Sequence, residues 1–179
     1  MQVKYQDDIK KLLEAEHTTA QRNKIVSFIG SNSMKMKALM SFFLDSKWHW
    51  RFNQRAAWPV NVIGRKQPKM IKPYLEKMVK VLKNPSHNAV ARNTMSIFQE
   101  IDIPEHIEGE LYERSFEFLR NPKEPIAVRA FSISVLTRIA IKYPDLQGEL
   151  IAEVEEHLPH GTAAYKSRAK RALALLKDQ

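Results

Sequence analysis

A tryptophan- and arginine-rich segment is the part of this chain whose residue types could do chemistry, because all three tryptophans lie close together there with arginines between them. On a helix, Trp50, Gln54 and Trp58 share one face, and Arg51 and Arg55 lie on an adjoining face. Aromatic rings beside guanidinium groups can stack on bases and contact phosphates. Large aromatics are also common at the edge of a packed core. The segment predicts core packing for at least two of the tryptophans, with a binding surface as the alternative.

Positive charge is concentrated around the same segment. The chain carries a net charge of +9, and residues 51–100 alone carry +8, whereas residues 101–150 carry −3. Such an uneven charge would draw a polyanion or an acidic protein surface toward the middle of the chain. The lysines between residues 69 and 83 are explained more simply as a solvated face that keeps the protein soluble.

Sites for metals and for acid–base chemistry are poorly supported. His157 and His160 lie near Glu153 and Glu156, but a turn separates the histidines and no further ligand is close in sequence. The chain has no cysteine and therefore no thiolate chemistry. It also lacks a glycine-rich phosphate loop, a Gly-x-Ser-x-Gly elbow and a zinc-protease motif. We therefore expect no catalytic residue, no metal and no cofactor.

Helices must position these side chains. The chain has only five glycines and is rich in Ala, Leu, Lys, Glu, Arg and Met, which favours an all-α fold. No stretch approaches the roughly 18 apolar residues of a membrane-spanning helix, and the first residues lack an apolar signal core. We expect a cytoplasmic protein without membrane association.

Five arginines at intervals of 33, 37, 37 and 39 residues reveal a repeat: Arg22, Arg55, Arg92, Arg129 and Arg168. In the two clearest copies, Leu-Lys-Asn-Pro before Arg92 matches Leu-Arg-Asn-Pro before Arg129 without a gap. Periods of this size indicate stacked helical pairs. The spacing predicts five repeats in a single domain over residues 1–179, at about 4–30, 34–64, 68–101, 105–144 and 145–179.

The segments 73–92 and 116–129 resemble HEAT-like repeats, a family of α-solenoids. The resemblance implies about five antiparallel helix pairs in a right-handed superhelix, with the second helix of each pair on the concave side. It also implies that most of the repeated arginines are stacking residues. In this family an acidic residue at the inter-helix turn often pairs with the arginine. Here Asn84 and Asn121 hold that position, and we expect their amides to replace it.

The resemblance further implies a non-enzymatic scaffold that binds a macromolecular partner, a protein or peptide, on its concave face. The candidate binding residues are Trp50, Arg51, Gln54, Arg55, Trp58, Asn88 and Arg92. The alternative is a nucleic-acid-binding protein that uses residues 47–92 and is similar, at the level of the fold, to alkylpurine DNA glycosylases, which have HEAT-like folds. Those enzymes use tryptophans, an aspartate and an arginine around a distorted duplex. In this chain Trp48-His49-Trp50-Arg51 does not match their Trp-Asp-rich motif, and Asp45 is the only acid near the cluster.

Overall fold

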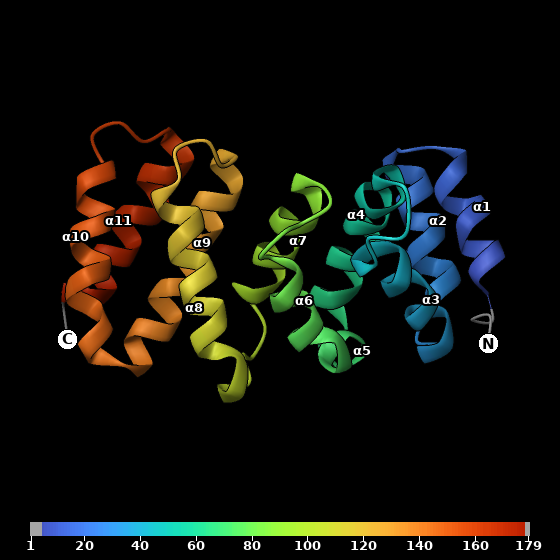
Figure 1. The fold of residues 1–179 in the computed structure, drawn as a ribbon, viewed down its shortest axis with the longest axis horizontal. Helices are drawn as coiled ribbons and strands as arrows, with labels where there is room; N and C mark the ends of the chain where they lie inside the picture. Colours follow the sequence, from blue (N-terminus) through green and yellow to red (C-terminus); the bar gives the residue numbers. More distant parts are fainter. Residues whose placement is uncertain (1–4, 178–179) are drawn as a thin grey trace. The chain divides into compact units, whose positions relative to one another are not determined.

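The computed structural model describes residues 5–177, and within that range the chain forms helices and no strand, so the all-α prediction is confirmed (Figure 1). Backbone contacts divide the chain into two compact units, which we call the N-terminal unit (Met1–Ile97) and the C-terminal unit (Phe98–Gln179). The N-terminal unit holds α1 (Gln6–Ala15), α2 (Thr19–Ile29), α3 (Ser33–Leu44), α4 (Trp50–Lys66), α5 (Pro68–Ile71), the 3₁₀ turn η1 (Lys72–Tyr74), α6 (Leu75–Val81) and most of α7 (Asn88–Phe98). The C-terminal unit holds α8 (Glu105–Arg120), α9 (Ile126–Lys142), the 3₁₀ turn η2 (Pro144–Leu146), α10 (Gln147–His157) and α11 (Ala163–Lys177).

Local sequence signals set the ends of several helices. Thr18 begins α2 because its side chain accepts a hydrogen bond from the backbone N–H of Gln21 at 3.1 Å. Gly30 ends the same helix with a φ of 52°, a value that favours glycine. Asn32 caps α3 in the way that Thr18 caps α2. In the C-terminal unit, Pro144 follows Tyr143, the C-cap of α9, and prevents the helix from continuing.

The second repeat was expected to end at about residue 64, where glycine is a common helix end, but Gly64 does not end its helix. It lies inside α4, which continues to Lys66, and it is buried. A Cβ atom at this position would lie 2.8 Å from Cδ1 of Ile71 and 3.2 Å from Cδ1 of Ile97. The glycine therefore permits close packing of α5 and α7 against α4, which explains its place better than a helix end does.

The repeat expected to begin at about residue 68 opens with an interrupted helix. Pro73 lacks an N–H for the helical ladder and its ring crowds the preceding turn, and a 3₁₀ turn accordingly separates α5 from α6. The apolar stripe along this segment is nevertheless buried: Ile71, Leu75, Met78 and Leu82. The break changes the local backbone without moving the stripe out of the core.

Side-chain donors on second helices satisfy the last carbonyls of first helices, which have no partner within their own helix. Gln21 Nε2 donates to the carbonyl of Leu12 at 2.6 Å, and Arg129 Nε donates to that of Leu119 at 3.0 Å. Asn53, which is fully buried, donates to the carbonyls of Phe42, Phe43 and Asp45 at 2.9, 3.3 and 3.2 Å. Three different residue types thus close the helix pairs.

The expected pairing of turn asparagines with the repeated arginines is not present in residues 5–177. Asn121 Oδ1 accepts from the backbone N–H of Lys123 at 3.0 Å, within its own turn. Arg129 instead donates to a carbonyl of the first helix. An asparagine amide lacks the charge of an aspartate, and the backbone carbonyl of Leu119 is the acceptor of Arg129 instead.

The core of the C-terminal unit is mostly aliphatic and contains two aromatic residues, Phe116 and Tyr165. It comprises Phe116, Leu119, Ile133, Leu136, Ala140, Leu150, Val154, Tyr165, Ala169, Ala172 and Leu176. These residues come from α8, α9, α10 and α11, so all four helices are needed to enclose it. Small residues of α11 face this core, which allows α11 to lie close to α9.

Candidate interaction surface

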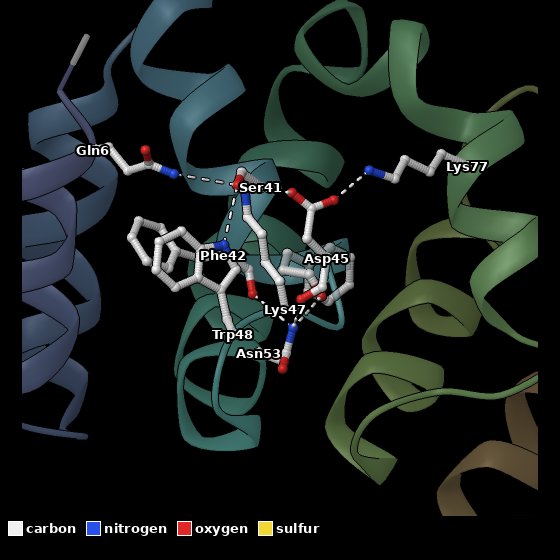
Figure 2. Close-up of polar contacts among 9 residues, drawn as sticks. Gln6, Ser41, Phe42, Asp45, Lys47, Trp48, Asn53 and Lys77 are labelled. Atoms are coloured by element: carbon white, nitrogen blue, oxygen red, sulfur yellow. Dashed lines mark hydrogen bonds and ion pairs between the residues drawn. The ribbon is translucent and has the colours of Figure 1, made fainter. Parts of the chain in front are cut away.

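Trp48 belongs to the packing of the N-terminal unit. Its ring lies 4.5 Å from that of Phe42 and 6.1 Å from that of Phe52, between ring centroids. Its indole Nε1 donates to Ser41 Oγ at 3.2 Å, so its one polar atom has a partner (Figure 2). A half-buried tryptophan held in this way has little free ring surface for a ligand.

Asp45, the acid nearest the tryptophans in sequence, is tied down by a polar network at the end of α3 (Figure 2). Its carboxylate accepts a hydrogen bond from Ser41 Oγ at 2.9 Å and forms an ion pair with Lys77. Lys47 Nζ lies 3.9 Å from the same carboxylate. Gln6 joins the network through Ser41. These contacts indicate that Asp45 stabilises the local fold.

Trp58 and Arg55 are also used inside the molecule. The guanidinium of Arg22 lies 4.5 Å above the centre of the Trp58 ring, and the ring of His17 is 6.0 Å away. Arg55 Nη1 donates to the carbonyls of Leu13 and Glu14, at 2.6 and 2.9 Å, at the end of α1. Both side chains are half-buried. They join α4 to the first helix pair.

Trp50 differs from the other two tryptophans because 42% of its surface is exposed. Its ring is stacked on that of His87, with 5.3 Å between centroids and 8° between planes. The guanidinium of Arg51 lies 5.5 Å from the centre of the same ring. His87 Nδ1 in turn accepts from the N–H of Ala89 at 3.0 Å. The stack therefore joins the beginning of α4 to the beginning of α7.

Exposed polar residues follow both members of the stack along the chain. Arg51, Asn88 and Arg92 are all exposed, and Asn88 and Arg92 share one face of α7 because they are four residues apart. We call the group Trp50, Arg51, His87, Asn88 and Arg92 the Trp50–His87 face. The sequence pattern identified every member except His87, which no helical spacing links to Trp50.

The predicted candidates therefore separate into two groups. Trp50, Arg51, Asn88 and Arg92 lie on the exposed face, whereas Arg55 and Trp58 make internal contacts. Gln54 is half-buried between these groups on α4. The repeated arginines divide in a similar way, since the structure gives internal partners to four of them: Arg22, Arg55, Arg129 and Arg168. Arg92 has no hydrogen-bond or ion-pair partner in residues 5–177.

A family model described as HEAT repeat domain matches residues 9–174. The chain belongs to the HEAT repeat family. No curated protein and no solved structure matches it significantly. As a HEAT repeat protein it is a helical repeat scaffold, an architecture that typically serves protein interactions. None of the helices in residues 5–177 has the length and apolar character needed to cross a membrane.

Two acids of α10, Glu149 and Glu153, form ion pairs with Arg120 of α8. His157 Nε2 lies 3.1 Å from Glu153 Oε1, and Glu153 also accepts from Arg120 Nε at 2.7 Å. His160 and Glu156 are exposed outside this group. In the part of the chain that the structure describes, no three His, Asp or Glu side chains are grouped as metal ligands would be.

Proposed function

We propose that this HEAT repeat protein is a non-enzymatic scaffold that binds an acidic protein or peptide through the Trp50–His87 face. The observation that carries the proposal is the exposed Trp50 ring, which contacts both His87 and Arg51, with exposed polar residues of α7 following His87 in the chain. Tryptophan and arginine are the residues most enriched among those that dominate binding energies at protein interfaces.

The charge of the N-terminal unit supports an acidic partner. Residues 1–97 contain 18 Lys or Arg and 6 Asp or Glu, whereas residues 98–179 contain 11 and 14. The two units thus carry net charges of +12 and −3. Long-range attraction would direct an acidic surface to the N-terminal unit and speed its association.

Nucleic acid is the second candidate because the same unit is strongly basic. The limited free surface of the tryptophan rings favours a protein partner. His87 already covers one face of the Trp50 ring, and Trp48 and Trp58 have internal partners. Proteins that bind single strands use successive open rings as stacking platforms. The ion pair and hydrogen bond of Asp45 also argue against a catalytic role for that acid.

A charge-reversal experiment tests the proposal. The double variant Arg51→Glu, Arg92→Glu alters the proposed face, and Lys69→Glu, Lys83→Glu makes the same change of charge at exposed lysines elsewhere in the N-terminal unit. Arg55 is left unchanged because its replacement would break a hydrogen bond to α1 and could lower stability as well as binding. Proteins captured from an extract by the wild type are identified, and the affinity of each purified candidate is measured for all three forms.

We expect the arginine variant to lose at least about tenfold in affinity, with the lysine variant close to wild type and equal melting temperatures. Equal losses in both variants would indicate attraction by overall charge and would contradict a defined face. The three proteins are also titrated with a labelled DNA duplex and a single strand. Micromolar binding to either that falls steeply with salt and requires Arg51 and Arg92 would establish the nucleic-acid alternative.

A further inference from the structure

The C-terminal unit contains a groove with a volume of about 540 Å³ between α9 and α11. We call it the C-terminal groove. The residues that define its chemistry are Ser134, Arg138 and Ile141 of α9 and Arg168, Arg171 and Leu175 of α11. Its size lies within the range of sites that hold a drug-sized ligand or a few side chains.

The two walls of the groove run in the same direction. Arg129 lies over the ring of Tyr165 at 5.4 Å, and further along both helices Arg168 lies over the ring of Phe131 at 4.9 Å. Both contacts join residues 36 or 37 positions apart. This offset places Arg171 across from Ser134.

One part of the groove is positively charged. Arg138, Arg168 and Arg171 line it with a single acid, Glu100, although the unit as a whole carries a net charge of −3. Arg138 is fixed because its Nη1 donates to the carbonyls of Phe98 and Ile101 at 2.6 and 2.8 Å. Arg171 is exposed and forms no ion pair or hydrogen bond within residues 5–177.

The other part of the groove is aliphatic. Ile141 is 37% exposed and Leu175 is 48% exposed, and both line the groove. Large aliphatic side chains exposed together beside cations are typical of a surface that another protein covers. A side chain seated between them would remove apolar surface of both residues from water.

We propose that the C-terminal groove binds a segment of a partner protein that carries an aliphatic side chain next to a carboxylate. The aliphatic side chain lies between Ile141 and Leu175, and the carboxylate pairs with Arg171 and Arg168. Guanidinium groups bind carboxylates through paired hydrogen bonds. Nucleic acid would satisfy the arginines but leave the two aliphatic residues uncovered, so the observations favour a peptide. The proposal is independent of the Trp50–His87 face, because every residue it uses belongs to the C-terminal unit.

A random library of short peptides displayed on phage, selected on the full chain, tests the proposal. Enriched peptides are synthesised with a fluorescent label, and their affinities are measured by anisotropy for the wild type and single variants. Arg171→Glu removes the free cation, and Lys170→Glu makes the same charge change on the neighbouring exposed residue, which does not line the groove. Leu175→Ser removes the aliphatic wall. Arg51→Glu identifies peptides that bind the Trp50–His87 face.

We expect enriched peptides with adjacent acidic and aliphatic residues, weakened about tenfold or more by Arg171→Glu and by Leu175→Ser, and changed less than about twofold by Lys170→Glu. Replacing the acidic residue of the peptide by its amide should weaken wild-type binding to a similar degree. The proposal is overturned if no enriched peptide depends on Arg171 and Leu175, even where some depend on Arg51. A labelled duplex that competes for the groove and depends on Arg171 but not on Leu175 would also overturn it.

Discussion

Asn53 illustrates how much of this molecule depends on single buried polar groups. Its amide nitrogen serves three carbonyls at the end of α3, and the side chain is fully buried. A carbonyl left without a donor in that position loses both its hydrogen bond and its access to water. Asn84, in contrast, is exposed at a turn.

Replacing Asn53 by alanine should therefore lower the free energy of unfolding by about 1–3 kcal/mol. Asn84→Ala is the matched control, and we expect a change within about 0.5 kcal/mol because its side chain is on the surface. Urea denaturation followed by circular dichroism measures both. A large loss in Asn84→Ala would show that the asparagine–arginine pairing of the family pattern exists in solution after all.

Glu108 is a buried acid whose neighbours favour its ionised form. Burial opposes its ionisation, but hydrogen bonds from Lys142, at 2.9 Å, and Tyr143, at 2.7 Å, outweigh that effect and lower its pKa. A lowered folded-state pKa adds stability above the pKa of the unfolded chain, and this stability is lost as the pH falls through the folded value.

Melting temperatures of the wild type and Glu108→Gln should consequently differ most near neutral pH and converge below about pH 4, because the ordinary pKa of glutamate is about 4.3. Glu113→Gln, an exposed acid on the same helix, is the control and should melt like the wild type across this range. A gap between Glu108→Gln and wild type that stays constant with pH would show that charge has no part in the contact.

At the scale of the helix, Gly64 shows tertiary packing prevailing over helix propensity. Glycine inside a helix costs about 0.5–1 kcal/mol relative to alanine. In α4 this cost is offset because Gly64 allows close contact with the buried Ile71 and Ile97. Gly109, inside α8, has no atom within 4 Å of the place where a Cβ would be.

The two glycines should thus respond to alanine with opposite signs. Gly109→Ala should stabilise the protein by about 0.5–1 kcal/mol through propensity alone. Gly64→Ala should destabilise it by up to about 2 kcal/mol, since overpacking costs about 1–3 kcal/mol against the same gain. Adding Ile71→Val, which removes the nearest methyl group, should recover part of this loss. Additive effects of the two substitutions in a denaturation cycle would refute the steric explanation.

The helices could be predicted from the sequence largely because their ends carry local signals. Gly30 and Pro144 act within a few residues of their own position, and helices end where the repeats are predicted to end, at about residues 30 and 144. Gly64 misled because its partners, Ile71 and Ile97, are brought to it only by folding. The stack of His87 on Trp50 was missed for the same reason. Both errors concern a contact between helices that residue spacing does not encode.

At the scale of the whole molecule, α7 crosses the division between the two units. Its residue Ile97 approaches Gly64 within the N-terminal unit, and the next residue, Phe98, supplies a carbonyl to Arg138 within the C-terminal unit. Unfolding either unit would remove a support of the same helix. The single domain over residues 1–179 stays a prediction, and this shared helix is the reason to expect cooperative unfolding.

Cooperativity can be tested with intrinsic signals, because all three tryptophans belong to the N-terminal unit while helices of both units contribute to far-ultraviolet circular dichroism. We expect thermal transitions followed by tryptophan fluorescence and by circular dichroism at 222 nm to coincide. A second circular dichroism transition, silent in fluorescence, would mean that the C-terminal unit unfolds separately and that the chain has two domains.

The closing of helix pairs by Gln21, Asn53 and Arg129 has a consequence for recombining repeats. The three side chains differ in length and charge, yet each delivers an N–H to a carbonyl at the end of the preceding helix. A repeat needs at this point a side chain that is long enough to reach the carbonyl and that carries an N–H donor. The residue type can therefore differ between repeats while the hydrogen bond is kept. Repeats from distant members of the family should accordingly be combined by matching the length of this side chain to the loop between the two helices, even where the aligned residues differ.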